Sequence, residues 1–255
     1  MRHLLSALAC LICVALPLHA EEVVADLSQD RVSISTSFDG SEILVFGAVK
    51  RDAPIPQGAS PLAVIITISG PDEVVTVRRK DRRFGIWVNV EGVEVERAPS
   101  FYAVASTVPL DRALSETEDQ RWNISTGRKL RAVGATEMAE NPPAFLEALI
   151  RVREADGIYI QAAETVQLRD STLFSTEIAL PAALTEGDYN TRIFLTRDGQ
   201  VVDSYATSIF VQKVGLERFI YALAHEQPLI YGLLSLAIAI AAGWIASTVF
   251  RYLLP

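Results

Sequence analysis

The residues best suited to chemistry in this sequence form one basic run, Arg78-Arg79-Lys80-Asp81-Arg82-Arg83, in a chain of net charge −8 at pH 7. Guanidinium and ammonium groups bind oxyanions through charge-assisted hydrogen bonds, so the run favours a small anion, lipid phosphates or an acidic loop of another protein. The alternative is a solvated hairpin tip, balanced by glutamates on the returning strand. The candidate anion or partner contacts are Arg78, Arg79, Lys80, Arg82 and Arg83.

The sequence contains few residues suited to nucleophilic or metal-dependent catalysis. Cys10 and Cys13 lie in an N-terminal segment that we expect to be removed, together with His3 and His19, which leaves His225. A Ser-His-Asp site would have to use this histidine, on a predicted helix next to an apolar segment. No pair of carboxylates stands out by its spacing. We therefore expect no enzyme activity, no catalytic residue, no metal and no cofactor.

Segment 1–20 has the order of a secretory signal peptide. Met1-Arg2-His3 is basic, Leu4 to Leu18 is apolar apart from Ser6, and Leu18-His19-Ala20 suits a signal peptidase. Cleavage there would export the chain that follows, without a cysteine. The alternative is an uncleaved first membrane helix, for which the apolar stretch is short.

Segment 228–250, PLIYGLLSLAIAIAAGWIASTVF, contains no charged residue. As a helix it would extend roughly 34 Å, enough to cross a bilayer core of about 30 Å. Arg251 follows it and agrees in sign with the positive-inside rule. These features predict a bacterial inner-membrane protein with a periplasmic N-terminal domain and a cytoplasmic tail, 251–255.

Small residues recur every four positions along this predicted transmembrane helix. Such a face allows another transmembrane helix to approach closely, which predicts association with a permease or another multi-span protein, or with a second copy of the chain. The acidity of the chain argues against nucleic acid and against a broad electrostatic membrane-binding face. The predicted helix-packing residues are Ser235, Ala239, Gly243 and Ser247.

Between the two apolar segments, the patterning predicts a mostly β ectodomain of the immunoglobulin-like sandwich type. Region 22–109 contains short alternating or apolar strands, region 110–157 is a helical insertion, and region 158–214 returns to strands. Segment 215–227 has helical spacing and ends at the break marked by Gln227-Pro228. Whether the two β-rich regions form one sheet system or two stays open.

Two turn signals support a sandwich. Asp198-Gly199 is typical of a two-residue β-hairpin turn. Gly187-x-Tyr189 resembles the tyrosine corner of immunoglobulin-like sandwiches, in which the phenol bonds back to the chain. The disulfide cysteine expected two residues later is Thr191 here, so the pattern fits only a cysteine-free sandwich.

Large apolar residues at strand or helix spacing are assigned to the core rather than to a pocket. Trp87, Phe101 and Tyr102 lie in predicted strands, where aromatic residues are usually buried. Pro142-Pro143 opens a predicted helix, because proline is favoured in the first turn. The expected buried face of this helix is Phe145, Leu146, Leu149, Ile150 and Val152.

Several of these segments occur together in a recognisable order before the C-terminal span. They are Gly85-Ile86-Trp87-Val88-Asn89, the stretch 99–106, FLEALIRVRE, Leu173-Phe174, and Leu180-Pro181 with the Gly187-x-Tyr189 turn. As a set they resemble an uncharacterised alphaproteobacterial transmembrane protein family, which has no assigned activity or catalytic residues. Its members often neighbour permeases that resemble the TauE/SafE sulfite exporters. The resemblance therefore implies an accessory role to a transporter, by association and without a mechanism.

We therefore expect a single-span inner-membrane protein whose periplasmic ectodomain is an accessory or interaction module of a membrane complex, beside a TauE/SafE-like exporter. The alternative is a periplasmic binding protein for a small anion, centred on the basic hairpin at 78–83. Replacement of the four arginines in that run would abolish ligand binding under the alternative and leave complex formation unchanged under the first hypothesis.

Overall fold

The computed structural model describes residues 21–34, 40–51, 58, 60–133, 139, 141–214 and 216–253 of the chain. The predicted signal peptide and the last two tail residues lie outside these ranges. The chain divides into two compact units, of which one contains residues 1–32 and 39–211 and the other residues 33–38 and 212–255. Apart from the last two residues of β2 and of β12, the sheets belong to the first unit, and the C-terminal helices belong to the second.

The first sheet has four antiparallel strands in the order β1-β3-β10-β9. Because successive side chains of a strand point to opposite faces, alternate residues such as Ile43, Val45 and Phe174 are buried on its inner face. The strands are β1 (Glu21–Leu27), β3 (Ser41–Arg51), β9 (Gln167–Arg169) and β10 (Leu173–Leu180).

The second sheet has six strands in the order β2-β12-β11-β4-β7-β8, and a separate two-stranded ribbon consists of β5 and β6. Every residue of β4 is buried, as expected for a central strand covered on both faces. β7 and β8 pair in parallel across the helical insertion. The strands are β2 (Arg31–Ile34), β4 (Ala63–Ser69), β5 (Asp72–Arg83), β6 (Ile86–Pro99), β7 (Tyr102–Ser106), β8 (Tyr159–Ala162), β11 (Gly187–Arg197) and β12 (Gln200–Lys213).

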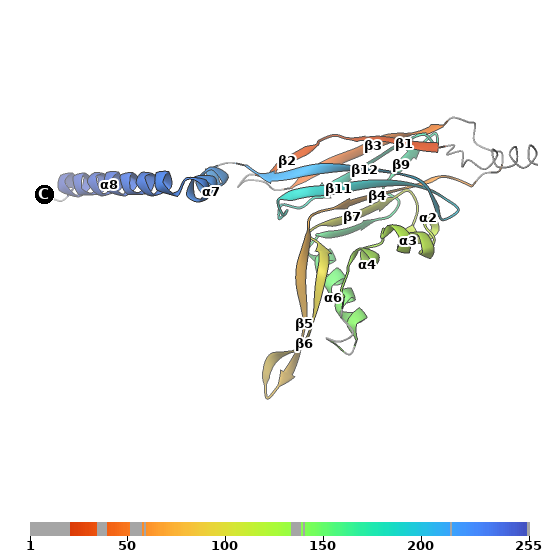
Figure 1. Cartoon of the computed structure of the whole chain (residues 1–255), viewed down its shortest axis with the longest axis horizontal. Coiled ribbons are helices and arrows are strands. Elements are labelled where there is room, and N and C mark those ends of the chain that lie inside the picture. Colours follow the sequence, from red (N-terminus) through yellow and green to blue (C-terminus); the bar gives the residue numbers. More distant parts are fainter. Residues whose placement is uncertain are drawn as a thin grey trace, which may run out of the picture. The chain divides into compact units, whose positions relative to one another are not determined.

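Both predicted β-rich regions contribute strands to both large sheets. β3 pairs with β10 in the first sheet, and β4 pairs with β11 in the second. The two regions therefore form one sheet system, which answers the question that the sequence left open. Figure 1 shows the four-stranded sheet lying over one face of the six-stranded sheet. This arrangement confirms the predicted mostly β fold and is compatible with an immunoglobulin-like sandwich.

The two predicted turns have the expected geometry. Asp198 and Gly199 have φ values of 51° and 74° between β11 and β12, and a type I′ hairpin turn requires a positive φ at both positions. The hydroxyl of the buried Tyr189 donates a hydrogen bond to the Thr185 carbonyl oxygen at 2.9 Å, which is the contact of a tyrosine corner. Burial raises the pKa of this phenol, so it stays a donor.

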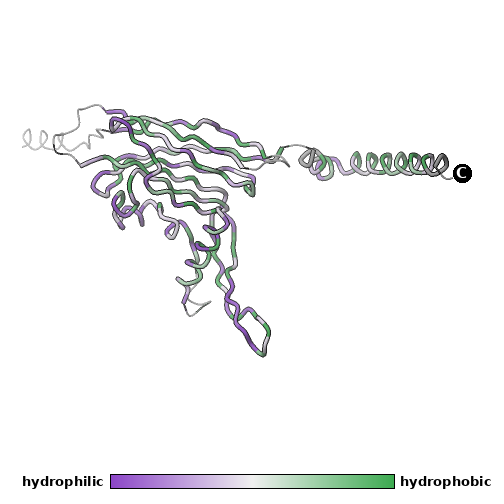
Figure 2. The backbone as a smooth tube through the Cα atoms, turned by 180° about the vertical axis from the view of Figure 1, so that it is seen from behind, coloured by the Kyte–Doolittle hydropathy of each residue, from purple (hydrophilic) through white to green (hydrophobic). Residues whose placement is uncertain are grey.

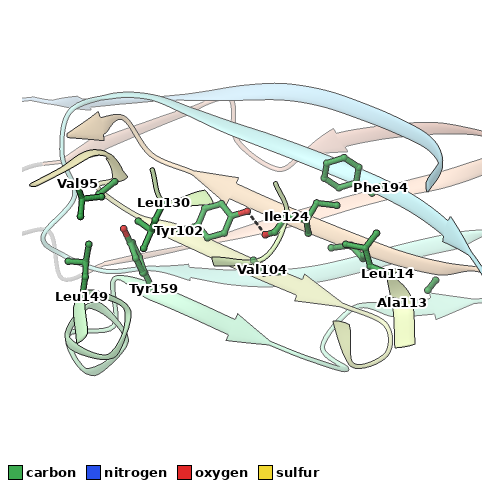
Figure 3. Close-up of a cluster of buried hydrophobic side chains, with 13 residues drawn as sticks. Val95, Tyr102, Val104, Ala113, Leu114, Ile124, Leu130, Leu149, Tyr159 and Phe194 are labelled. Carbon is green, nitrogen blue, oxygen red and sulfur yellow. Dashed lines mark hydrogen bonds between the residues drawn. The ribbon is translucent and has the colours of Figure 1, made fainter. Parts of the chain in front are cut away.

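Helices cover the other face of the six-stranded sheet and form part of a buried apolar cluster (Figure 3). The Tyr102 hydroxyl donates to the Ile124 carbonyl oxygen at 2.6 Å and ties the helical insertion to β7. Burial raises the pKa of Tyr102 to about 12. The helices are α2 (Leu110–Ala113), α3 (Glu116–Trp122), α4 (Thr126–Lys129) and α6 (Pro142–Ala155).

The core assignments are correct for most of the predicted residues and wrong for two. Phe101 and Tyr102 are buried, as are Phe145 and Leu149 on α6. Val152 is 54% exposed, because helical spacing predicts the direction of a side chain and not whether another element covers the last turn. The second error, Trp87, lies on the β5–β6 ribbon and is 69% exposed.

In the second unit, α7 (Leu216–Glu226) and α8 (Pro228–Leu253) are separated at Gln227, where the sequence predicts a break. Segment Pro228–Val249 of α8 is long and apolar enough to cross a membrane. The helix continues to Leu253, beyond the predicted end at 250.

Candidate functional site at the tip of a projecting hairpin

The β5–β6 ribbon has a packed base and a free distal part. At the base, Val93 and Val95 are fully buried, and Val95 belongs to the cluster that includes Leu149 of α6 (Figure 3). Beyond the cross-strand pair of Val77 and Val93, β5 continues through Arg78–Arg83 with exposed side chains. Six further residues extend the ribbon by about 20 Å at about 3.3 Å per residue. Figure 1 shows the ribbon projecting away from the sheets.

Polar contacts also hold the base of the ribbon. Arg153 of α6 forms an ion pair with Glu73 of β5. The Tyr159 hydroxyl of β8 donates to the Pro99 carbonyl oxygen at 3.0 Å. The amide of Arg131 donates to the carbonyl oxygen of Arg97 at 3.0 Å, after the end of α4. Contacts from several elements therefore fix the base, and the distal part extends from a firm support.

The outermost turn contains an aromatic residue in an unfavourable backbone conformation. Phe84 and Gly85 have φ values of 51° and 84° and connect β5 to β6 in a two-residue turn. Asn, Asp and Gly suit these positions, whereas the left-handed conformation costs another L residue about 1–2 kcal/mol. The sequence therefore places a bulky apolar residue at the end of the ribbon against its local preference.

Cationic and apolar side chains lie opposite each other at this end, which we call the hairpin tip and define as residues 82–87. Phe84, Ile86 and Trp87 are 106%, 64% and 69% exposed. Arg82 is directly opposite Trp87, and Arg83 is directly opposite Ile86. Because opposite residues of an antiparallel pair share a face, each face of the tip carries a cation beside an apolar side chain. Figure 2 shows the hydrophobic end beyond a hydrophilic stretch.

Ion pairs within the ribbon balance part of its charge. Residues 78–91 carry five cationic and two acidic side chains, a net charge of +3. A nitrogen of Arg79 lies 3.1 Å from Glu91, and a nitrogen of Arg83 lies 3.7 Å from Asp81. The balancing role predicted for the returning strand is thus present at Glu91, whereas Glu96 accepts a hydrogen bond from a backbone amide at 2.6 Å.

The other three cations of the run are open to external contacts. Within the described ranges, no carboxylate oxygen lies within 4.0 Å of a side-chain nitrogen of Arg78, Lys80 or Arg82. Strand alternation places these three residues on one face of β5 and Arg79 and Arg83 on the other. The structure therefore collects the predicted contact residues on one exposed ribbon without enclosing a common point between them.

Sequence reasoning found the charge of this site and missed its apolar half. Phe84 was not singled out, Ile86 was used only in the family resemblance, and Trp87 was assigned to the core. The signal that could have revealed this half is the pair Phe84-Gly85 between two strands. It was overlooked because two-residue hairpin turns are normally recognised by Asn-Gly or Asp-Gly.

A second exposed apolar surface lies on the outer face of the four-stranded sheet. A depression of about 540 Å³ is lined partly by Val24, Phe46 and Leu173. Gly47 also lines it, and a Cβ atom at this position would lie 2.5 Å from Cζ of Phe174, so the close packing requires glycine. The depression is open to solvent, which suits a surface contact better than an enclosed ligand.

On α8, the predicted packing residues lie on one side of the helix at a spacing of four. Apart from its chain neighbours and the backbone of its own helix, nothing in the described chain would lie within 4 Å of a Cβ atom at Gly243. The hydroxyl of Ser235 donates to the Tyr231 carbonyl oxygen of the same helix at 2.8 Å, so its hydrogen bond is made within the helix. That this face packs against another helix stays a prediction, which rests on the four-residue spacing of small side chains. The residues are Ser235, Ala239, Gly243 and Ser247.

These observations define a mostly β chain with one C-terminal helix able to span a membrane. The chain belongs to the family described as "Putative transmembrane protein" (Alph_Pro_TM), whose model matches residues 22–252. This match confirms the resemblance found in the sequence. No curated protein matches the chain.

Two solved structures show distant likenesses. Spo0M, a sporulation control protein from Bacillus subtilis, is 12% identical over 80% of this chain and 54% of its own, with a TM-score of 0.28. The N-terminal domain of the Streptococcus gordonii adhesin Sgo0707 is 8% identical over 74% of this chain and 32% of its own, with a TM-score of 0.29. The chain thus spans about half of the first structure and a third of the second, and neither likeness supports an argument about fold or function.

Proposed function

We propose that this protein is a non-enzymatic interaction module of a membrane complex, anchored by α8 in a bacterial inner membrane. Its ectodomain lies in the periplasm and its C-terminus in the cytoplasm, beside a transporter of the TauE/SafE-like type. The observation that carries the proposal is the small-residue face of α8. Helix association in a bilayer depends on close van der Waals packing, which small side chains permit.

The ectodomain supports the same function with exposed apolar surface. Val24, Phe46 and Leu173 gather at the depression on the outer face of the four-stranded sheet. Gathered apolar side chains on a protein surface are typical of sites that contact another molecule. A partner held by α8 in the membrane would be presented to this surface at a high effective concentration.

The alternatives receive less support from the geometry. A small-anion site requires cations that converge on one ligand, whereas the cations of β5 lie on both faces of an exposed ribbon. A hydrolase would depend on His225, whose Nδ1 lies 2.9 Å from the Tyr221 carbonyl oxygen of its own helix and whose ring stacks on Tyr221. An interaction module fits these features better than either.

The test is an affinity purification of the full-length, detergent-extracted protein as wild type, Gly243→Leu and Ala241→Leu. The two substitutions add the same side chain, but two residues along a helix correspond to about half a turn, so Ala241→Leu modifies the opposite face. We expect a multi-span permease to co-purify with the wild type and Ala241→Leu and to be lost from Gly243→Leu. Replacement of Arg78, Arg79, Arg82 and Arg83 should leave this complex intact.

Recovery of the protein alone from all variants would contradict the proposal, as would a permease retained equally by both leucine variants. Co-expression of two differently tagged copies separates self-association from binding to another protein. If the second copy is recovered in place of a permease, the helix face mediates self-association and the transporter part of the proposal is wrong.

A further inference from the structure

We propose that the hairpin tip is a membrane-contact site, which inserts its apolar side chains into the headgroup region of an anionic phospholipid bilayer while its cations bind lipid phosphates. This inference concerns a surface that the proposed docking function does not use, and it rests on that function only for the anchoring of the chain at a membrane. The ligand chemistry is that of an anionic lipid surface.

Both faces of the hairpin tip carry a cation beside an apolar side chain, which fits a lipid layer that surrounds the tip. Arg82 lies beside Trp87 on one face, and Arg83 lies beside Ile86 on the other. A small anion or the wall of a protein groove would contact one of these faces. A lipid headgroup layer meets both faces at once, with the arginines reaching phosphates while their stems cover apolar surface.

The residue types of the tip also match the interface of a bilayer. Trp is enriched at membrane–water interfaces, because its ring is apolar and its indole nitrogen donates a hydrogen bond. Phe84 is the outermost residue and is fully exposed, with its backbone at a positive φ. An outlier of this kind points to a function that folding alone does not explain, and insertion into an apolar layer supplies one.

A protein partner is the less suitable occupant of this tip. Stable protein interfaces bury about 800 Å² on each partner. Phe84, Ile86 and Trp87 cannot supply that area, since an aromatic side chain buries about 150–250 Å². Insertion into lipid needs no such area, because the anchor α8 already holds the chain at a bilayer and makes the second contact intramolecular.

The test uses the full chain with Cys10 and Cys13 replaced by serine, so that one introduced cysteine carries an environment-sensitive fluorophore. Ile86→Cys places it at the tip, and Val74→Cys places it near the base of the same ribbon, where the native residue is equally exposed at 64%. The purified protein is reconstituted into phosphatidylcholine vesicles with or without phosphatidylglycerol. Each vesicle is probed with a nitroxide-labelled lipid and with aqueous iodide.

We expect the label at position 86 to be quenched by the nitroxide lipid and protected from iodide in anionic vesicles only. The label at position 74 should stay accessible to iodide in both kinds of vesicle. Equal quenching of the two positions by the nitroxide lipid, or equal insertion of position 86 into neutral and anionic vesicles, would overturn the proposal. Protection at position 86 in native membranes, but not in anionic vesicles that contain this protein alone, would also overturn it and assign the tip to a protein.

Two variants separate the apolar contribution from the charge while keeping the fold. Phe84→Asn creates an Asn-Gly turn, which favours the observed type I′ conformation, so the hairpin is retained while insertion at position 86 is lost. In the double variant Arg82→Gln with Arg83→Gln, quenching of the label at position 86 by the nitroxide lipid should no longer depend on phosphatidylglycerol. Unchanged insertion in both variants would overturn the proposal. The protein is reconstituted alone, so this result is independent of whether a permease partner is found.

Discussion

At the scale of single residues, Glu21 joins the two large sheets through a buried charge cluster. Its side chain is 5% exposed, and Oε1 accepts hydrogen bonds from Nε of Arg51 and from Nη2 of Arg197, both at 2.9 Å. Glu21 lies on β1, Arg51 on β3 and Arg197 on β11, so the cluster spans both sheets. Removal of one partner from a buried charge cluster leaves the other charges uncompensated.

This cluster predicts a specific dependence of stability on pH. Burial alone raises the pKa of the Glu21 carboxyl, but the hydrogen bonds from Arg197 and Arg51 outweigh it and hold the pKa below the ordinary value of 4.5. A depressed pKa in the folded state means that the stabilisation is complete above the unfolded value and is lost as the pH falls through the folded value. We expect Glu21→Gln to lower the free energy of unfolding at pH 7 by about 2 kcal/mol and to weaken its decline below about pH 4.5.

Thermal unfolding of the detergent-extracted protein, followed by circular dichroism across this pH range, provides the measurement. Glu22→Gln is the matched control, because Glu22 is the adjacent residue and pairs with Lys50 at 2.8 Å on the surface. Its substitution should change the stability at pH 7 far less. If the two variants lose the same stability, the burial of the Glu21 cluster does not determine the effect.

At the scale of elements, local patterning predicts strands and turns but not how they are covered. The Asp198-Gly199 turn, the Tyr189 corner and the apolar strand β4 each depend on contacts that a short stretch of sequence specifies. The parallel pairing of β7 with β8 depends instead on where the helical insertion returns the chain. The exposure of Trp87 also depends on the tertiary arrangement. The local sequence of β6 resembles that of a buried strand, but this part of the ribbon extends beyond the elements that cover its base.

The candidate site likewise has one half that the sequence predicts and one half that depends on the tertiary arrangement. A run of five cations is visible in the sequence whatever the fold, so the charged half of the hairpin could be predicted. Its apolar half could not, because Phe84, Ile86 and Trp87 are ordinary core residues by type and become a surface only where nothing packs on them. The packing face of α8 stays a prediction, which rests on helix geometry because residues four positions apart lie on one side of a helix.

Helix α6 should support the hairpin through one side of its surface. Leu149 is 6% exposed and lies in the cluster with Val95 and Tyr159, whereas Val152 is 54% exposed. We expect Leu149→Ala to lower the free energy of unfolding by about 2–4 kcal/mol, because it leaves a cavity under the ribbon, and Val152→Ala to change it by less than about 0.5 kcal/mol. Chemical denaturation of the two variants measures both values. A larger loss in Val152→Ala would contradict the packing of α6.

At the scale of the whole molecule, the proposed topology depends on the apolar helix α8. Pro228–Val249 is able to span a membrane, and the sheets belong to residues before it. A helix that crosses a membrane places the residues on its two sides in different compartments. Under the proposed topology, the sheets would lie on one side and Arg251 on the other, in the direction that the positive-inside rule favours.

This topology is tested with single cysteines in a chain that lacks Cys10 and Cys13. Thr117→Cys places a thiol at an exposed position of α3, far in sequence from both the hairpin tip and the span, and Leu254→Cys places one after α8. In cells with a permeabilised outer membrane, we expect a membrane-impermeant maleimide to label position 117, and to label position 254 only after the inner membrane is broken. The opposite pattern would invert the proposed orientation. Labelling of both positions before lysis would mean that α8 does not separate them, and the anchoring on which both proposals depend would fail.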